Sequence, residues 1–198
     1  MIKKAVFLQS SPDLASCPLP TLPEFAFIGR SNVGKSSLIN MLTRHGNLAK
    51  VSSVPGKTRH IVFCTVDDSW RLVDLPGYGY ARVSQARRAQ FAAAALDYIA
   101  RRETLHCLFV LVDSRIPPQD IDLRFVNYLG ENGIPFALVF TKTDKLAERR
   151  WRVNTDAFMQ RMSETWEAFP PVFFTSSATG AGRDELLRFI LGSMKSNS

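Results

Sequence analysis

The sequence predicts an α/β protein of three layers, in which helices cover a doubly wound, mostly parallel sheet of six strands, one of them antiparallel. Two observations predict this class. Short apolar runs typical of buried strands alternate with segments whose apolar residues recur at helical spacing. Glycine-rich and acidic motifs follow the apolar runs, where the carboxyl ends of strands form ligand sites in open α/β sheets. From 198 residues we expect one domain at 23–198 after an N-terminal arm at 1–22.

Composition narrows the class of protein. Apolar residues make up 45% and charged residues 22%, as in soluble globular proteins. The net charge of +7 favours a polyanionic partner, nucleic acid or a membrane surface, without choosing between them. Three scattered cysteines form no disulfide framework or zinc spacing and favour a reducing cytosol. No apolar run approaches the roughly 18 residues of a membrane helix. From the cysteines we expect a cytoplasmic protein.

The first motif is a glycine-rich loop between an expected strand at 25–28 and an expected helix at 37–42. It matches G-x-x-x-x-G-K-[ST] with the residues Gly29, Arg30, Ser31, Asn32, Val33, Gly34, Lys35 and Ser36. Loop N–H groups and a helix dipole favour an anion here. Lys35 would reach the β- and γ-phosphates of a nucleotide, and the Ser36 hydroxyl would ligate Mg²⁺. The alternative is a glycine turn that happens to end in Lys-Ser.

A hairpin leads to the second motif. After a polar loop at 50–59, strand-like residues at 60–66 and 70–73 flank a turn at 67–69, which predicts the antiparallel pair. The second strand runs into Asp74, Leu75, Pro76 and Gly77. Asp74 would hold Mg²⁺, directly or from its second shell, and Gly77 would bring a backbone N–H close to a γ-phosphate. Alone this tetrapeptide is an ordinary turn, and it gains weight from the phosphate loop before it.

The second half continues the alternation. The expected helices are 84–102, 121–129, 145–167 and 184–194, and the expected strands are 105–112, 135–140 and 172–175. Gly130 and Gly133 are stop signals for the second of these helices. Arginines at both ends of 84–102 form either a solvated face or a polyanion contact, and the sequence favours neither.

The strand at 135–140 ends in a motif that selects the base: Thr141, Lys142, Thr143 and Asp144. Asp144 can accept two hydrogen bonds from the ring N–H and exocyclic amine of guanine, a pair that adenine lacks. The Lys142 stem can cover the face of the ring. Alternatively, Asp144 only complements the dipole of the next helix. After the last strand, Ser176, Ser177 and Ala178 could offer backbone N–H groups to the guanine O6.

In this order the motifs resemble those of a Ras-like P-loop GTPase domain, and more closely the EngB family, also called YsxC or YihA, of bacterial ribosome-assembly GTPases. The matching stretches are Gly-Arg-Ser-Asn-Val-Gly-Lys-Ser at 29–36, Pro-Gly-Lys-Thr-Arg at 55–59, Asp-Leu-Pro-Gly-Tyr-Gly-Tyr-Ala at 74–81, Asp-Ser-Arg at 113–115, Thr-Lys-Thr-Asp at 141–144 and Thr-Ser-Ser at 175–177. The resemblance covers 25 to the C-terminus. Thr141 stands where most GTPases have Asn, and a Thr at this position resembles the motif of this family.

The resemblance implies a cytosolic enzyme that hydrolyses GTP to GDP and phosphate as a slow switch in assembly of the large ribosomal subunit. Growth and cell division, including septation, would depend on it through ribosome supply. The implied partners are rRNA and ribosomal proteins, with no membrane, and we expect a monomer. Catalytic roles fall on Lys35, Thr58 and Gly77, and Mg²⁺ ligation on Ser36, Thr58 and Asp74. Further nucleotide contacts are expected from Gly56, Lys57, Arg59, His60 and Thr175.

Tyr78 occupies the position where many GTPases carry the glutamine that orients the attacking water. Tyrosine has no carboxamide, so we expect slow intrinsic turnover, with the catalytic group supplied by a partner, water or an ion. Asn32 resembles the K⁺ ligand of related potassium-activated GTPases; the alternative is that it only hydrogen-bonds within its loop. The loops at 51–59 and 77–85 are expected to order with GTP and loosen with GDP.

Three classes of function remain open. The first is a GTPase switch that acts on the ribosome or on another ribonucleoprotein. The second is a kinase or ATPase, against which Asp144 argues. The third is a GTP-regulated RNA-binding scaffold in which hydrolysis is secondary, against which the phosphate loop, Thr58 and Asp74 argue together.

Overall fold

The computed structural model describes residues 2–44, 60–78 and 85–195. They form a three-layer α/β domain around a seven-stranded sheet of order β1-β3-β4-β2-β5-β6-β7. The strands are β1 Ala5–Ser11, β2 Glu24–Gly29, β3 Ile61–Val66, β4 Trp70–Asp74, β5 Leu105–Asp113, β6 Phe136–Thr141 and β7 Val172–Phe174. Among these strands only β3 runs against the others, because both of its neighbours, β1 and β4, pair with it antiparallel. The α/β class and its antiparallel strand are confirmed.

The strand count predicted from the sequence is wrong, because the first strand was expected to be part of an N-terminal arm. β1 adds to the edge of the sheet beside β3, with an irregularity between Phe7 and Gln9. Only its end residues, Ala5 and Ser11, are buried, while Val6, Phe7 and Leu8 are exposed. An edge strand with so little burial produces no clean alternation of apolar and polar residues, which is the signal that a prediction needs.

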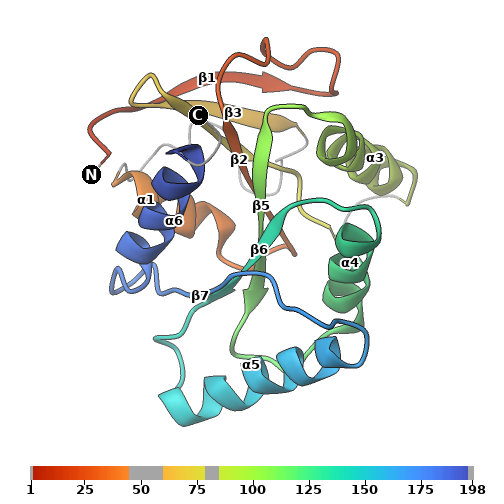
Figure 1. The fold of residues 1–198 in the computed structure, drawn as a ribbon, viewed down its shortest axis with the longest axis vertical. Helices are drawn as coiled ribbons and strands as arrows, with labels where there is room; N and C mark the ends of the chain where they lie inside the picture. Colours follow the sequence, from red (N-terminus) through yellow and green to blue (C-terminus); the bar gives the residue numbers. More distant parts are fainter. Residues whose placement is uncertain (1, 45–59, 79–84, 196–198) are drawn as a thin grey trace.

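Helices cover both faces of the sheet, as Figure 1 shows. Their bounds are α1 Lys35–Thr43, α3 Gln85–Arg101, α4 Asp120–Glu131, α5 Glu148–Ser163 and α6 Arg183–Lys195. Leu38, Leu42 and Leu186 place α1 and α6 in the core on one face. Tyr98, Val126 and Phe158 place α3, α4 and α5 in the core on the other. No helix in the described part of the chain is both long and apolar enough to span a membrane.

Alternate residues of the central strands feed these two cores. In β2, Phe25 and Phe27 join the core beneath α1 and α6, while Ala26 and Ile28 join the core beneath the other helices. All residues of β2 and β6 are buried, as expected of parallel strands covered on both faces. This central part of the sheet is the rigid support for the loops at its carboxyl end.

Two expected helix boundaries need correction. α5 is shorter than 145–167 at both ends. It begins at Glu148, after a turn at 143–144 and a bend at 145–146, and it ends at Ser163. Trp166, beyond its end, donates its indole N–H to Asn127 of α4, 2.8 Å away. Gly130 does not stop α4, which continues to Glu131. A Cβ at Gly130 would lie 2.3 Å from the ring of Trp166, so glycine allows the two elements to pack. Gly133 has a φ of +64° and follows the end of the helix, as predicted.

Candidate active site

Four strands end in residues that the sequence analysis singled out. β2 ends at Gly29, β4 at Asp74, β5 at Asp113 and β6 at Thr141. The parallel registers pair Phe27 with Asp74 and Asp113 with Thr141, so these ends lie at the same edge of the sheet. The structure therefore brings the phosphate loop, the acidic motif and the base motif together at the carboxyl ends of the strands, where ligands bind in this class of fold.

The phosphate loop leads directly into a helix. Gly34 precedes α1 with a φ of 108°, a backbone conformation that glycine adopts without a steric penalty, and its carbonyl accepts the N–H of Leu38. Lys35 is the first residue of α1, and Ser36 is exposed beside it. Val33 is buried and anchors the loop in the core. The N–H groups of the first helical turn have no partners within the helix, which makes this end suitable for an anion.

Lys35 and Asp74 face each other across the loop. The Lys35 ammonium forms an ion pair with Oδ1 of Asp74. Asp74 is buried, and its other oxygen, Oδ2, has no hydrogen-bond partner within the described part of the chain. A buried carboxylate oxygen without a partner is costly, so this oxygen marks a position at which a cation or a donor would be bound. The following residues, Leu75, Pro76 and Gly77, are buried as well.

The base motif is tied to the phosphate loop at two points. The Thr141 hydroxyl donates to the carbonyl of Val33 at 2.6 Å. The Lys142 ammonium donates to the carbonyl of Asn32 at 2.6 Å and to Oδ2 of Asp113 at 2.8 Å. Thr141, which replaces the usual Asn, thus still connects the two loops. Both hydrogen bonds hold the end of the Lys142 side chain, so its stem is fixed between the backbone and the anchored ammonium.

Asp113 is a site residue that the sequence analysis quoted only for its resemblance. Burial raises the pKa of Asp113, but hydrogen bonds from Arg115 and Lys142 outweigh burial and lower that pKa to about 2. The carboxylate therefore stays charged and holds Lys142 in position. An Asp at the end of a long apolar run was the available signal, since it falls at the same strand end as Asp74 and Thr141.

Asp144 is held by the loop that follows β7. Ser176 donates its hydroxyl to Oδ1 of Asp144 at 2.7 Å, and Lys145 lies 3.0 Å from Oδ2. The hydrogen bond from Ser176, followed by that from Lys145, lowers the pKa of Asp144. The backbone N–H of Ser176 donates to Ala181, which leaves Ser177 and Ala178, both exposed, as the residues that could present N–H groups to a base. Thr175 accepts hydrogen bonds from Thr143, which joins the two loops.

A second cluster, missed in the sequence, joins the phosphate loop to α4. Asp122 is buried in α4 and accepts hydrogen bonds from Nε of Arg30, at 3.1 and 3.2 Å, and from the Tyr78 hydroxyl at 3.0 Å. Burial raises the pKa of Asp122, while Arg30 and Tyr78 oppose that rise. The Tyr78 ring packs on Phe125, with ring centroids 4.6 Å apart. An acid at helical spacing from the buried Val126 and Leu129 was the signal for this cluster.

The remaining predicted site residues are those for which the structure gives no contact with the arrangement above or no description. Gly56, Lys57, Thr58 and Arg59 lie outside the described residues, as do most of the two loops expected to respond to GTP. His60 is exposed, and its Nδ1 lies 3.2 Å from the Ser10 hydroxyl of the edge strand β1. Ser31 is exposed in the phosphate loop.

The fold and the loops at its carboxyl edge define a nucleotide-binding domain of the P-loop GTPase class. A family model described as "50S ribosome-binding GTPase" matches residues 24–142. Probable GTP-binding proteins EngB from Porphyromonas gingivalis and Bacteroides fragilis are 57% and 53% identical to the chain, each over 96% of this chain and 94% of the relative. The chain belongs to the EngB family of GTP-binding proteins, and it is a GTP-hydrolysing enzyme.

A solved structure supports the fold. The crystal structure of a probable GTP-binding protein EngB matches with a TM-score of 0.63 at 21% identity, covering 87% of this chain and 99% of the other. At that identity the match concerns the arrangement of strands and helices, which agrees with the three layers described above.

Proposed function

We propose that this GTPase is a slow nucleotide switch in the assembly of the large ribosomal subunit, acting as a cytoplasmic monomer. The observation that carries this proposal is the family match, whose printed description concerns ribosome binding. The net charge of +7 supports a partner rich in RNA. Growth and cell division would then depend on the protein through the supply of ribosomes.

In this proposal the phosphate loop binds and orients the triphosphate. Lys35 lies at the first turn of α1, beside Asp74, and would exchange this carboxylate for the β- and γ-phosphates. The loop N–H groups would hold the same phosphates, and Gly77 would add its own N–H near the γ-phosphate. Lys35, Gly77 and Thr58 thereby act at the phosphate that is transferred to water.

The residues at the mouth of the loop fit Mg²⁺. Hard oxygen donors are what this cation prefers, and Asp74 Oδ2 is a buried oxygen with no partner in the described part of the chain. Ser36, Thr58 and Asp74 would hold the cation. When bound, it would neutralise charge on the β- and γ-phosphate oxygens.

Selection of guanine is assigned to the base motif. Asp144, already oriented by Ser176, would accept the ring N–H and exocyclic amine of the base. The Lys142 stem would cover one face of the ring, since its ammonium is anchored to Asn32 and Asp113. Adenine offers no such pair of donors and would leave the Asp144 carboxylate unpaired.

Slow intrinsic turnover is the expected result of Tyr78. Its hydroxyl bonds to Asp122 and its ring packs on Phe125, so the side chain is directed to α4. A K⁺ ion beside Asn32 is proposed as a source of the missing charge, because an exposed amide oxygen suits a monovalent cation. Hydrolysis in matched KCl and NaCl, for wild type and Asn32→Ala, tests this assignment. A rate that ignores K⁺ in both proteins would contradict it.

Co-sedimentation with isolated large-subunit particles tests the switch itself. We expect tighter binding with a non-hydrolysable GTP analogue than with GDP, and binding that weakens steeply as salt rises. Equal affinity in the two nucleotide states would overturn the switch, because a ligand without differential affinity shifts no equilibrium. The protein would then be better described as an RNA-binding scaffold. Absence of binding in every state would remove the ribosome from the proposal.

A further inference from the structure

The outer face of α5 carries a surface hollow next to the base motif. Leu146, Arg149, Arg150, Val153 and Asn154 line this hollow, which has a volume of about 480 Å³. In Figure 1, α5 crosses the lower end of the view. The opposite face of the helix is the buried one, with Trp151 and Phe158 among its residues. The hollow therefore belongs to the solvent side of α5.

Two arginines in the hollow retain uncompensated charge. The other cations of this region are paired: Lys145 with Asp144, Arg152 with Glu148 and Arg161 with Asp120. Arg149 and Arg150 are exposed and form no ion pair with any described residue. Their guanidinium groups are thus free to bind an anion from outside the chain.

The same surface is also apolar. Leu146, which lies just before α5, and Val153, one turn beyond the arginines, line the same hollow as Arg149 and Arg150. Val153 is 63% exposed, so its aliphatic side chain is available to a partner on this surface. Guanidinium forks match phosphate geometry, and an apolar surface between them suits a base or sugar. This combination fits a nucleic-acid strand better than a free phosphate.

We propose that this hollow binds a single-stranded segment of large-subunit rRNA, with phosphates on Arg149 and Arg150 and an unstacked base against Leu146 and Val153. RNA is read mainly in such unpaired segments, whose bases are accessible to side chains. The inference rests on the proposed function, since it names the contact through which the GTPase reaches its ribosomal partner. The chain's net charge of +7 has the sign that this contact requires.

Hydrogen bonds connect the hollow to the ends of the strands beside the base motif. Asn154 donates to the carbonyl of Ser114 at 2.9 Å, and the Ser114 hydroxyl donates to the carbonyl of Thr141 at 2.7 Å. Leu146 follows Asp144 by two residues. GTP and GDP present the same base to this motif. The contact should therefore add equally to the affinity for RNA in both nucleotide states.

A matched pair of double variants tests the proposal. Arg149→Gln/Arg150→Gln removes the two free charges, whereas Arg101→Gln/Arg188→Gln removes two charges that already interact with Asp97 and with the carbonyl of Asp184. Binding is measured to large-subunit particles and to protein-free large-subunit rRNA, with GDP and with a GTP analogue. Thermal unfolding and basal GTP hydrolysis serve as checks, and both should be unchanged in the two variants.

We expect the test variant to lose about tenfold or more in affinity for both probes at about 0.1 M salt, equally with either nucleotide, and the control to lose much less. The slope of log affinity against log salt should fall by roughly 1.4, the value for two phosphate contacts on a single strand. Equal losses in the two variants would overturn the inference. A loss on particles but not on rRNA would assign the hollow to a ribosomal protein instead.

The wild-type protein separates this inference from the proposed function. If wild type does not bind particles but keeps arginine-dependent binding to rRNA, the ribosomal function is removed and the RNA contact remains. Failure to bind either probe would remove both.

Discussion

Each end of the sheet buries an acidic side chain, and the two acids are treated differently. At the amino end, Glu24 begins β2 and is fully buried. Its Oε1 accepts hydrogen bonds from Arg71 and Arg102, and its Oε2 from Tyr98 and Arg102. At the carboxyl end, Asp74 closes β4 with one oxygen paired to Lys35 and the other without a partner in the described residues.

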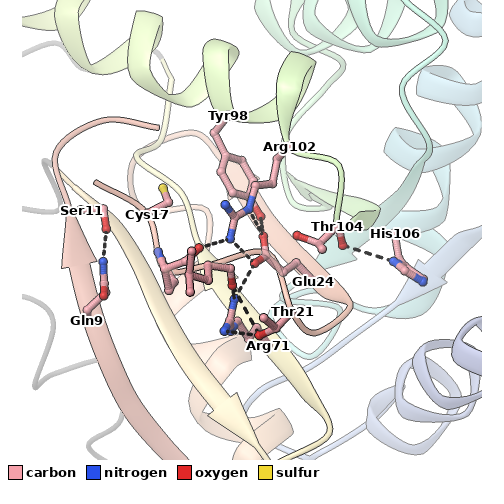
Figure 2. A network of polar contacts seen from close by, with 12 residues as sticks. Gln9, Ser11, Cys17, Thr21, Glu24, Arg71, Tyr98, Arg102, Thr104 and His106 are labelled. Carbon is pink, nitrogen blue, oxygen red and sulfur yellow. Dashed lines mark hydrogen bonds and ion pairs between the residues drawn. The ribbon is translucent and has the colours of Figure 1, made fainter. Parts of the chain in front are cut away.

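The arginines around Glu24 extend its influence to the chain before β2 (Figure 2). Arg71 donates to the carbonyl of Leu19 at 2.6 Å and to the hydroxyl of Thr21 at 3.1 Å. Arg102 donates to the carbonyl of Pro18 at 2.7 Å. The carboxylate thus holds β2, β4, the end of α3 and residues 18–21 together. Arg102, expected on a basic surface, is instead a partner of this buried acid.

Glu24 and Asp74 are both buried, but only Asp74 has an unpaired oxygen, and this difference distinguishes a structural acid from a functional one. A buried carboxylate whose oxygens are all occupied has nothing left to offer a ligand, and it fixes the elements around it. A buried carboxylate with an unpaired oxygen destabilises the protein when no ligand is bound, and a ligand that pairs with this oxygen removes that free-energy cost. We therefore expect variants at the amino end to change stability and variants at the carboxyl end to change activity.

Among these variants, Glu24→Ala should have the largest effect, a loss of stability. Removing the carboxylate leaves the Arg71 and Arg102 guanidinium groups near each other without a buried counter-charge, which costs about 3–5 kcal/mol in comparable cases. The free energy of unfolding, measured with urea, should fall by that amount. Asp97→Ala, which breaks the exposed pair with Arg101, is the control and should cost less than about 1 kcal/mol. Equal effects of the two substitutions would show that the Glu24 network is not a structural centre.

Asp74→Asn should show the opposite behaviour. The amide keeps the shape of the side chain but removes the charge that would hold Mg²⁺ at the β- and γ-phosphates, so single-turnover GTP hydrolysis should fall by about 10²–10³-fold. The free energy of unfolding without nucleotide should fall by less than in Glu24→Ala, because Asp74 has one cationic partner, Lys35, whereas Glu24 has two buried arginines. A variant with normal hydrolysis and strongly reduced stability would place Asp74 with Glu24.

How much of each end could be predicted from the sequence follows from the same contrast. The site at the carboxyl end of the sheet could be predicted from the sequence, because its residues occur in short contiguous motifs and those motifs follow apolar runs. Asp74 and Thr141 end β4 and β6, and Asp144 follows in the loop after β6, as the predicted alternation of strands and helices requires. The Glu24 network at the amino end could not be predicted, because Glu24 accepts hydrogen bonds from Arg71 and Arg102, which are 47 and 78 positions away in the sequence. No local pattern indicates which distant arginine will meet a buried acid.

The same reasoning explains the details that were missed at the site. Asp122 meets Arg30 across 92 positions, and Lys142 meets the carbonyl of Asn32 across 110. Each of these residues has an ordinary local environment in the sequence. Only the packing of α4 and β6 beside the phosphate loop brings them together. Motifs thus predicted which loops form the site, whereas the contacts that hold those loops required the structure.

Asp144→Asn sharpens the contrast within the carboxyl end, since this residue should affect binding more than stability. Loss of the acceptor should lower the affinity for GTP by about 1–3 kcal/mol, the scale of an unsatisfied polar group. Affinity for xanthine nucleotide should rise relative to GTP, because xanthine carries a carbonyl where guanine has an amine. Competition with labelled nucleotide measures both. Lys145→Gln, which removes the exposed partner of Asp144, is the control, and an unchanged preference for guanine in Asp144→Asn would exclude Asp144 as the base reader.

Asp113 gives the smallest effect, because it lies at the functional end yet is paired like Glu24. Its folded pKa of about 2 lies below the usual value of 3.8, so its contribution to stability is complete above about pH 4 and is lost as pH falls towards 2. We expect that contribution to be about 1–2 kcal/mol, because Arg115 is 41% exposed and solvent screens its part. The difference in unfolding free energy between wild type and Asp113→Asn should be constant from about pH 7 to 5 and should shrink by this amount near pH 2. A difference that stays constant down to pH 2 would mean that the charge of Asp113 does not stabilise the fold. Its hydrogen bond to Lys142 would then be a contact that positions the lysine for the base, without a measurable share in stability.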